Sequence, residues 1–514
     1  MKSSQVTISV SGLDHDSVVA VARHSAEVKL SPSALDALAR SSKIIEDLAK
    51  SDEPVYGIST GFGALATKHI APADRVALQQ SLIRSHAAGM GDVVEIEVVR
   101  AMQLLRLRTL CSGATGVRPI VAETIAMMLN ALITPVVYEY GSLGCSGDLA
   151  PLSHCALALM GEGEVFDKLG NRRLALDVLN EHKIKPIVLR EKEGLALING
   201  TDGMLGMLLM AITDLNELCT LADIATALSV EALLGTDQVF APEMHEPLRN
   251  HPGQVASAAN IFNLLKNSPL VASHRQDDTR VQDAYSLRCA PQVNGAVRDT
   301  ITHALNVAQR ELAAMIDNPV VTSSGDIRSN GNFHGAPIGY VLDFLAIAAC
   351  DLGSISERRT DRMLDTNRSM GLPAFLAYNA GVDSGLMIAQ YTQASMVSEN
   401  KRLAVPASVD SIPTSAMQED HVSMGWNAAR KLRLAINNLR RILAIEIFAA
   451  TRAIDFRAPL VASPALTKVV AEVRKVVDGP GPDRVLSQEM SQVETLAKSG
   501  VLQIAAETVS GPLN

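Results

Sequence analysis

The stretch GSLGCSGDLAPLSH, residues 141–154, places one thiol and one hydroxyl, Cys145 and Ser146, among glycines before a predicted helix. Glycine permits backbone angles that other residues avoid, and Asp148 is a favourable cap for a helix beginning at Leu149. A turn before a helix is therefore one interpretation. A serine-hydrolase nucleophile elbow is a second, but it requires G-x-S-x-G, and the glycine here comes one position too early.

The Cys145-Ser146-Gly147 triplet also has the residue types that a backbone cyclisation needs. The amide nitrogen of Gly147, a residue without a side chain, could attack the carbonyl carbon of Cys145 and close a five-membered ring. Loss of water from that ring and of the Ser146 hydroxyl would leave an exocyclic methylene, which is a strong electrophile made from the chain itself. The triplet alone leaves both the turn and the ring open.

Three polar loops carry aromatic or densely ionisable side chains, and they lie between segments with a helical pattern. They are TRVQDAYSLRCAPQV at 279–293, RSNGNFHGAP at 328–337 and VDSIPTSAMQEDHVSMG at 409–425. Loops held by a rigid scaffold often carry binding and catalytic groups, so we expect these loops to contribute to a site.

The elements that would position these loops are mostly helices. Hydrophobic residues make up 47% of the chain and aromatic residues only 3%, so the core must be mainly aliphatic. Apolar residues recur at helical spacing for about 30 residues from position 203, and comparable runs follow at 296–316, 338–359, 380–403 and 427–454. Before residue 200, β-like pieces such as VTISV and ITPVVYEY alternate with helical segments. We predict a mainly α protein with a smaller mixed α/β N-terminal domain at 1–200, which carries the triplet, and a long-helix bundle at 201–514.

Composition excludes several classes of protein. A net charge of −9 over 514 residues argues against a general nucleic-acid binder, which usually has a basic surface. The six cysteines show neither a CxxC pair nor a Cys/His spacing suited to zinc, so we predict no metal site and no disulfide framework. The N-terminus lacks the apolar region of a signal peptide, and the most apolar stretch, 203–213, is shorter than the roughly 18 residues of a membrane span. We expect a cytoplasmic protein with no membrane partner.

Six motifs, in one order, resemble those of the aromatic amino acid ammonia-lyases. Besides the triplet segment they are YGISTGFG (56–63), KEGLALINGT (192–201), VQDAYSLRCAPQV (281–293), GNFHG (331–335) and QEDHVSMG (418–425). The resemblance implies an aspartase/fumarase-like helix bundle and a 4-methylidene-imidazol-5-one (MIO) group, self-formed from Cys145-Ser146-Gly147 with no external cofactor. Most members have alanine where this chain has Cys145, whose side chain would lie outside the ring. Arg108 and Asp202 also differ from the residues commonest at their positions.

The resemblance also assigns roles to single residues. The family's reaction removes an α-amino group and a β-proton to give an acrylate, and Tyr56 matches the base that acts at the β-carbon. Arg288 would hold the substrate carboxylate, because a guanidinium can bind two oxygens at once. The matching positions around the ring and the substrate are Asn199, Gln282, Tyr285, Phe333 and Met387. Without the resemblance these residues have ordinary interpretations, such as a turn asparagine, a salt-bridged arginine or a core methionine.

Two positions indicate the substrate. Ser85-His86 resembles the pattern of the histidine ammonia-lyases, whereas the phenylalanine and tyrosine enzymes tend to have Phe-Leu or His-Leu there. Glu419 stands where the phenylalanine enzymes carry glutamine. A carboxylate and a histidine can both hydrogen-bond an imidazole, whereas a glutamate facing a bare phenyl ring would be a buried charge without a partner.

The expected function is therefore the conversion of L-histidine to trans-urocanate and ammonia, the first step of histidine degradation. Three alternatives stay open: a phenylalanine or tyrosine ammonia-lyase, an aminomutase of the same family, and a non-catalytic helical scaffold. The resemblance further implies a homotetramer in which loops from several chains meet at each site.

Overall fold

The computed structural model describes residues 4–50, 55, 57–61, 63, 67–276, 278 and 280–514. The chain forms two compact units, each built from several sequence segments. The first comprises residues 1–210, 305–343 and 406–430, and the second comprises 211–304, 344–405 and 431–514. The division into domains at residue 200 stays a prediction.

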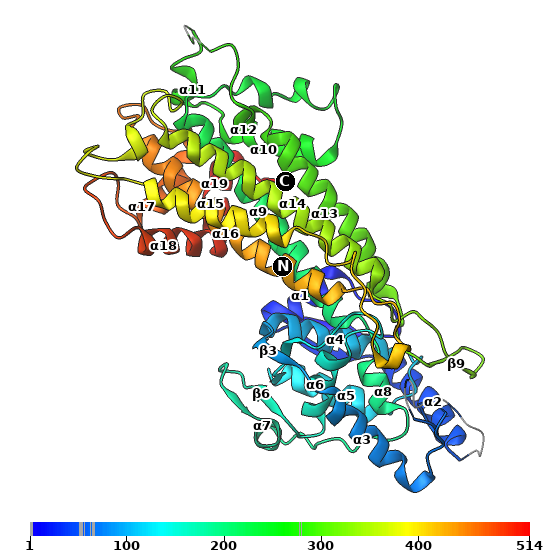
Figure 1. Ribbon diagram of the computed structural model, residues 1–514. Helices are drawn as coiled ribbons and strands as arrows, with labels where there is room; N and C mark the ends of the chain where they lie inside the picture. The colour runs from blue at the N-terminus through cyan, green and yellow to red at the C-terminus, as the bar shows by residue number, and fades with distance from the viewer. Residues whose placement is uncertain are drawn as a thin grey trace. The chain divides into compact units, whose positions relative to one another are not determined.

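The first unit combines helices with small sheets (Figure 1). Its helices are α1 (His15–His24), α2 (Pro32–Leu48), α3 (Arg75–His86), α4 (Ile96–Cys111), α5 (Pro119–Asn130), α6 (Leu149–Leu159), α7 (Ala175–Glu181) and α8 (Glu193–Ile198), with the short 3-10 helices η2 (Pro72–Asp74) and η6 (Ser415–Met417). Its strands are β1 (Gln5–Ile8), β2 (Glu27–Leu30), β3 (Met90–Val93), β4 (Thr134–Pro135), β5 (Tyr138–Tyr140), β6 (Glu164–Phe166), β7 (Arg172–Leu174), β8 (Val320–Val321) and β9 (Ile327–Arg328). Strands β1 and β2 pair in parallel, whereas the pairs β3–β5, β4–β6, β6–β7 and β8–β9 are antiparallel. The predicted mixed composition of this part of the chain is confirmed.

Helix α4 is buried along almost its whole length, although it carries three arginines. The guanidinium groups of Arg100, Arg106 and Arg108 donate hydrogen bonds to backbone carbonyls of other segments. Buried charges are tolerated when most of their donors are paired, and here only Nε of Arg100 and of Arg106 lack a partner among the described residues. Helix α4 therefore links other segments of the first unit as well as filling its core.

Long helices dominate the second unit. Four helices have residues in both units, namely α9 (Asp202–Ala232), α13 (Ala290–Ala313), α14 (Ala336–Leu364) and α16 (Gly425–Asp455). The other elements of the second unit are η3 (Gln238–Phe240), η4 (Pro242–Met244), α10 (Pro252–Leu264), α11 (Pro269–Ala272), α12 (Tyr285–Arg288), η5 (Ala374–Leu376), α15 (Met387–Leu403), α17 (Pro464–Arg474), α18 (Leu486–Ser499) and α19 (Val501–Ser510). The long helical runs predicted from the apolar spacing are confirmed.

In the part of the chain that the structure describes, two helical segments are long and apolar enough to span a membrane, Glu193–Ala232 and α14. The apolar window of the first is completely buried within the fold, and that of α14 is 61% buried. Helix α9 is therefore longer than the apolar stretch at 203–213 suggested. It is long enough to span a membrane, so the length of the apolar segment alone does not exclude one. Its burial argues against one, because an apolar helix surrounded by protein is a core helix.

A buried carboxylate on α16 joins three of the long helices in the second unit. Glu446 accepts hydrogen bonds from Arg359 and Ser356 of α14 and from Ser229 of α9. The side chains of Arg359 and Glu446 are both completely buried, with Nε and Oε1 2.5 Å apart. Since a buried charge without a partner is strongly destabilising, this pair fixes the register of α14 against α16.

We expect Glu446→Gln to destabilise the protein by about 3–5 kcal/mol, because Arg359 would keep a buried charge without a counterion. Urea unfolding followed by circular dichroism measures the change. Glu399→Gln is the matched control, because its partner Arg402 is exposed and such pairs contribute about 0–1 kcal/mol. Similar losses in the two variants would contradict the assigned role of Glu446.

Candidate active site

A cavity of about 1230 Å³ lies in the first unit. Seven of the predicted site residues line it: Ser85, His86, Cys145, Ser146, Asn199, Phe333 and Glu419. They come from α3, the loop before α6, the end of α8 and the loops at 328–337 and 409–425. The structure therefore brings together side chains that are up to 334 positions apart (85 to 419) in the sequence.

The other predicted residues are placed elsewhere. Gly147 follows Ser146 in the chain and is not among the described residues that line the cavity. Tyr56 lies outside the described residues. Gln282, Tyr285, Arg288 and Met387 belong to the second unit and are not among the described residues that line the cavity.

The backbone of the triplet is held at a very close approach to the turn at Asn199-Gly200. Gly147 has φ of +78°, and a Cβ built on it would lie 2.2 Å from the Gly200 carbonyl oxygen. The amide of the next residue, Asp148, donates to that same oxygen at 2.7 Å. Among the described residues the Gly147 amide has no hydrogen-bond partner. Only glycine fits here, and no hydrogen bond from its backbone nitrogen would have to be broken before that nitrogen could react.

Asp148 has a different role from the expected one. Helix α6 does begin at Leu149, but the Asp148 side chain does not cap it. Its carboxylate accepts instead from the amides of Gly203 and Met204, which open α9, and from the Ser142 hydroxyl. Burial raises the pKa of Asp148 to about 7, although these three hydrogen bonds act against the rise. One side chain thus joins the start of α9 to the loop that carries the triplet.

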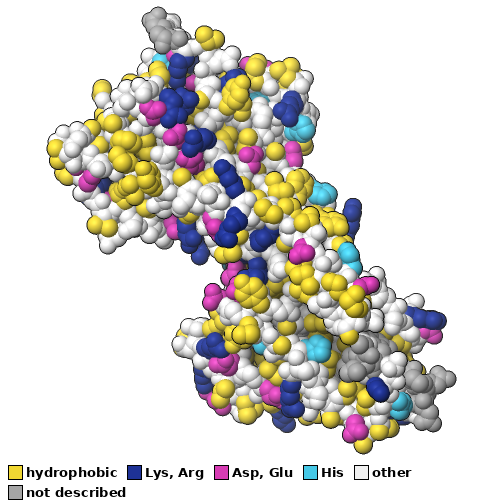
Figure 2. Space-filling model, viewed as in Figure 1, with side chains coloured by type: hydrophobic (Ala, Val, Ile, Leu, Met, Phe, Trp, Pro, Cys, Tyr) yellow, Lys and Arg dark blue, Asp and Glu magenta, His cyan; other side chains and the backbone are white. Residues whose placement is uncertain are grey.

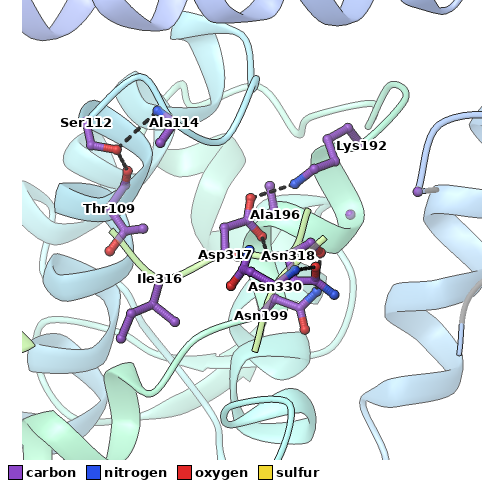
Figure 3. A network of polar contacts seen from close by, with 12 residues as sticks. Thr109, Ser112, Ala114, Lys192, Ala196, Asn199, Ile316, Asp317, Asn318 and Asn330 are labelled. Carbon is purple, nitrogen blue, oxygen red and sulfur yellow. Dashed lines mark hydrogen bonds and ion pairs between the residues drawn. The ribbon is translucent and has the colours of Figure 1, made fainter. Parts of the chain in front are cut away.

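A network of buried and half-buried polar groups positions Asn199 (Figure 3). Its side-chain amide donates to the Asn318 carbonyl at 2.9 Å, and Asn330 bonds to both Asn318 and the Asp317 carbonyl. The Asp317 carboxylate is in turn 2.5 Å from the Lys192 ammonium, and both side chains are completely buried. Burial lowers the pKa of Lys192, whereas Asp317 raises it.

Asn318 and Asn330 also line the cavity, and sequence reasoning missed them. The loop RSNGNFHGAP was expected to contribute, but nothing in the sequence distinguishes Asn330 from Asn332. The contacts with Asp317 and Asn318, thirteen and twelve positions earlier, make the difference.

The carboxylate of Glu419 is the charged centre of the cavity wall. It accepts from Ser146 Oγ at 2.7 Å, from Cys145 Sγ at 3.3 Å and from Thr414 Oγ1 at 3.0 Å. Burial alone would raise the pKa of Glu419, but these hydrogen bonds hold it below its ordinary value. Glu419 is therefore an anion that can accept a further donor from a ligand.

His86 is the second group suited to a heteroaromatic ligand. Burial lowers its pKa, and the Leu82 backbone and the charge of Glu419 oppose this only in part. Ser85 Oγ lies 3.0 Å from His86 Nδ1 and donates its one proton to the Leu82 carbonyl. A neutral imidazole has one donor and one acceptor nitrogen, so His86 can hydrogen-bond either a donor or an acceptor of a ligand.

Two further histidines line the cavity. His334 and His421 stack with ring centroids 5.3 Å apart, and Nε2 of His334 lies 3.3 Å from Nδ1 of His421. They are the only two histidines in the loops at 328–337 and 409–425. Among the described residues no group of three or more metal-ligating side chains is present.

The fold and this site define an enzyme of the carbon–nitrogen lyase class. The chain matches the aromatic amino acid lyase family over residues 13–475 and belongs to that family. It is 64% identical to a histidine ammonia-lyase of Streptomyces avermitilis over 509 residues, which cover 99% of both chains.

Solved structures agree with this assignment. The fold is similar to a tyrosine aminomutase from Streptomyces globisporus, with a TM-score of 0.93 and 37% identity over 99% of this chain and 100% of the other. A histidine ammonia-lyase from Trypanosoma cruzi gives a TM-score of 0.89 and 38% identity over 98% and 95%. The predicted aspartase/fumarase-like helical fold is confirmed.

We expect Gly200→Ala to destabilise the protein by about 1–3 kcal/mol, because overpacking a filled site has costs of this size. The new Cβ would lie 2.0 Å from Arg106 Nη2, which cannot withdraw because carbonyls and Asp202 hold its guanidinium. Urea unfolding measures the loss. Gly331→Ala adds a methyl group where no atom lies within 4 Å, so its midpoint should stay unchanged. Equal midpoints for the two variants would disprove the tight approach.

Proposed function

We propose that this enzyme removes ammonia from L-histidine to give trans-urocanate, the first step of histidine degradation in the cytoplasm. The observation that carries the proposal is the Glu419 carboxylate, which lies in hydrogen-bond contact with Ser146 and Cys145 in the cavity that His86 also lines. An imidazole N–H would donate to Glu419, and its other nitrogen can interact with His86. The histidine ammonia-lyases among the similar proteins support the same substrate.

The proposed electrophile is an MIO group formed from Cys145-Ser146-Gly147, and the geometry of the triplet fits it. Gly147 is confined to a positive φ against Gly200, and its amide has no partner among the described residues, which suits an attacking nitrogen. Ring closure releases one water from the Cys145 carbonyl oxygen and a second from the Ser146 hydroxyl. Once formed, the ring supplies an electrophile that makes the substrate's amino group a better leaving group.

The chain's own side chains would orient the substrate and move its protons. Asn199, fixed by Asn318, offers a polar group beside the triplet, and Phe333 contributes an apolar wall. Glu419 and His86 would hold the imidazole, with Ser85 in hydrogen-bond contact with Nδ1 of His86. Tyr56 is proposed as the base at the β-carbon.

The remaining proposed residues lie in the second unit, which suits sites completed by neighbouring subunits. Tyr285 is 72% exposed, with the Arg288 guanidinium 4.6 Å from its ring centroid. The buried Nε of Arg288 has no hydrogen-bond partner among the described residues. We propose that Arg288, Tyr285, Gln282 and Met387 reach a site in another subunit, where Arg288 binds the substrate carboxylate.

A homotetramer is proposed because apolar side chains stay exposed on long helices. On α14 they include Phe344 and Ile347, and on α15 Ile388 and Tyr391. Figure 2 shows hydrophobic side chains gathered on this face around α15. Contiguous exposed apolar surface on a helix typically marks an interface between protein molecules.

Ultraviolet absorbance of the purified protein mixed separately with L-histidine, L-phenylalanine and L-tyrosine tests the substrate, with no cofactor added. Urocanate from histidine alone is the expected result. Cinnamate or coumarate would identify an aryl ammonia-lyase instead. A β-amino acid detected by chromatography, with no acrylate, would identify an aminomutase, and the absence of every product would leave the scaffold interpretation.

Ser146→Ala should abolish ring formation, because the alanine has no hydroxyl to lose. We expect the intact mass to equal that of the unmodified sequence, whereas the parent protein should be lighter by two water molecules. Activity on histidine should fall at least about a thousandfold, as is usual when a covalent catalyst is removed. Ser324→Ala, in an exposed turn outside the cavity, is the control. Undiminished activity of Ser146→Ala would exclude the ring.

Glu419→Gln should lower kcat/KM for histidine about ten- to a hundredfold, because a hydrogen bond to a charged acceptor contributes about 1.5–3 kcal/mol. Steady-state urocanate formation measures the change. Asp410→Asn makes the same change of charge at an exposed position of the same loop, which is not among the described residues that line the cavity, and its effect should stay below about twofold. Equal effects of the two variants would show that the charge of the loop, rather than the contact, matters.

A further inference from the structure

We propose that the Cys145 thiol is a positioning residue for Glu419, which it holds by one carboxylate oxygen so that the other oxygen faces the substrate's imidazole. The inference rests on the proposed function and extends it to a residue for which alanine is the commoner choice in the family.

Four side chains hydrogen-bond to Glu419, of which Cys145 and Thr414 share one of its oxygens, while Ser415 is the fourth partner. Oε1 accepts from the Ser146 hydroxyl, at 2.7 Å. Oε2 accepts from the Cys145 thiol at 3.3 Å and from the Thr414 hydroxyl at 3.0 Å. Two donors on one oxygen fix the plane of the carboxylate better than one donor does, since they restrict its rotation about the terminal bond.

Ring closure would change these contacts in a defined way. The Ser146 hydroxyl leaves as water, so Oε1 loses its 2.7 Å donor. The Cys145 side chain takes no part in the ring and keeps its thiol, and Thr414 is untouched. Glu419 then has an oriented, half-buried oxygen that has lost a donor, and a ligand N–H can take the place of that donor.

The thiol is suited to this role because it stays protonated. Burial and the neighbouring Glu419 charge raise the pKa of Cys145 to about 12. At neutral pH the group is therefore a hydrogen-bond donor and not a thiolate nucleophile. Its sulfur packs in a small apolar cluster with Val422 and Met424, and this cluster holds the thiol in place.

The first test compares Cys145→Ala, which removes the donor, with Cys145→Ser, which keeps one. Intact mass establishes that each purified protein has lost two water molecules, and kcat for histidine is then measured against pH. Removing a donor to a carboxylate raises its pKa, so the acid limb of the Cys145→Ala profile should move up by about half a pH unit. Ionisation of the substrate contributes equally to all the profiles.

The conservative variant and a matched thiol control separate positioning from packing. Cys145→Ser should return the acid limb toward that of the parent, because the hydroxyl still donates. Cys350→Ala removes a buried thiol from α14, and its profile should coincide with that of the parent. An acid limb of Cys145→Ala that coincides with the parent's would overturn the proposal.

A second measurement needs no enzymatic activity. The rate at which iodoacetamide alkylates Cys145 at pH 9 is followed by peptide mass spectrometry in the parent and in Glu419→Gln. If the carboxylate holds the thiol protonated, Glu419→Gln should alkylate about threefold faster, since half a pH unit corresponds to that factor in thiolate. Equal rates would mean that the two side chains are not in contact.

The two measurements distinguish the proposals from each other. A parent protein that keeps its full mass, or that yields no urocanate, would disprove the proposed function, while the alkylation rates would still decide the Cys145–Glu419 contact. A parent with the ring, urocanate formation and equal alkylation rates would disprove the inference alone.

Discussion

The site depends on one backbone contact, the approach of Gly147 to Gly200. Neither glycine has room for a Cβ: one at Gly147 would meet the Gly200 carbonyl, and one at Gly200 would meet Arg106. Arg106 lies against Gly200 and donates to the carbonyls of Ala196, Asn199 and Ile316. Because these backbone acceptors fix the planar guanidinium, Arg106 holds Gly200 in place, and Gly200 in turn fixes the backbone of the triplet.

Buried charges around this contact are paired across long stretches of sequence. Arg106 pairs with Asp202, and Lys192 pairs with Asp317. Each ion has lost most of its hydration, so its position is specified by the partner that replaces water. Asn199 carries no charge, but its side chain is positioned by its hydrogen bond to the Asn318 carbonyl, next to Asp317 in the chain. The polar groups facing the cavity are thus oriented by ions that do not face it.

Much of the fold follows from local pattern. The aliphatic runs at helical spacing determine α9, α13, α14, α15 and α16, and the Gly-rich stretch before Leu149 determines a turn. Most of the cavity residues were predicted because they lie in a motif with several matching neighbours in sequence, and Ser85-His86 was predicted from its own two-residue pattern. Asp148 shows where such reasoning ends: its sequence context favours a cap on α6, but its carboxylate binds the start of α9, 55 residues later. Asn318 and Asn330 were missed for the same reason, since their contacts are not encoded by the residues beside them.

The Ser146–Glu419 hydrogen bond has a further consequence for the maturation of the protein. On the proposed chemistry, the immature chain has its own hydroxyl hydrogen-bonded to Oε1 of the carboxylate that would bind the substrate. An intramolecular donor has a high effective concentration, so free histidine pairs with this oxygen less readily before the ring forms than after it. The step that creates the electrophile also removes the competing hydroxyl as water, so the protein gains its electrophile and a better substrate acceptor together.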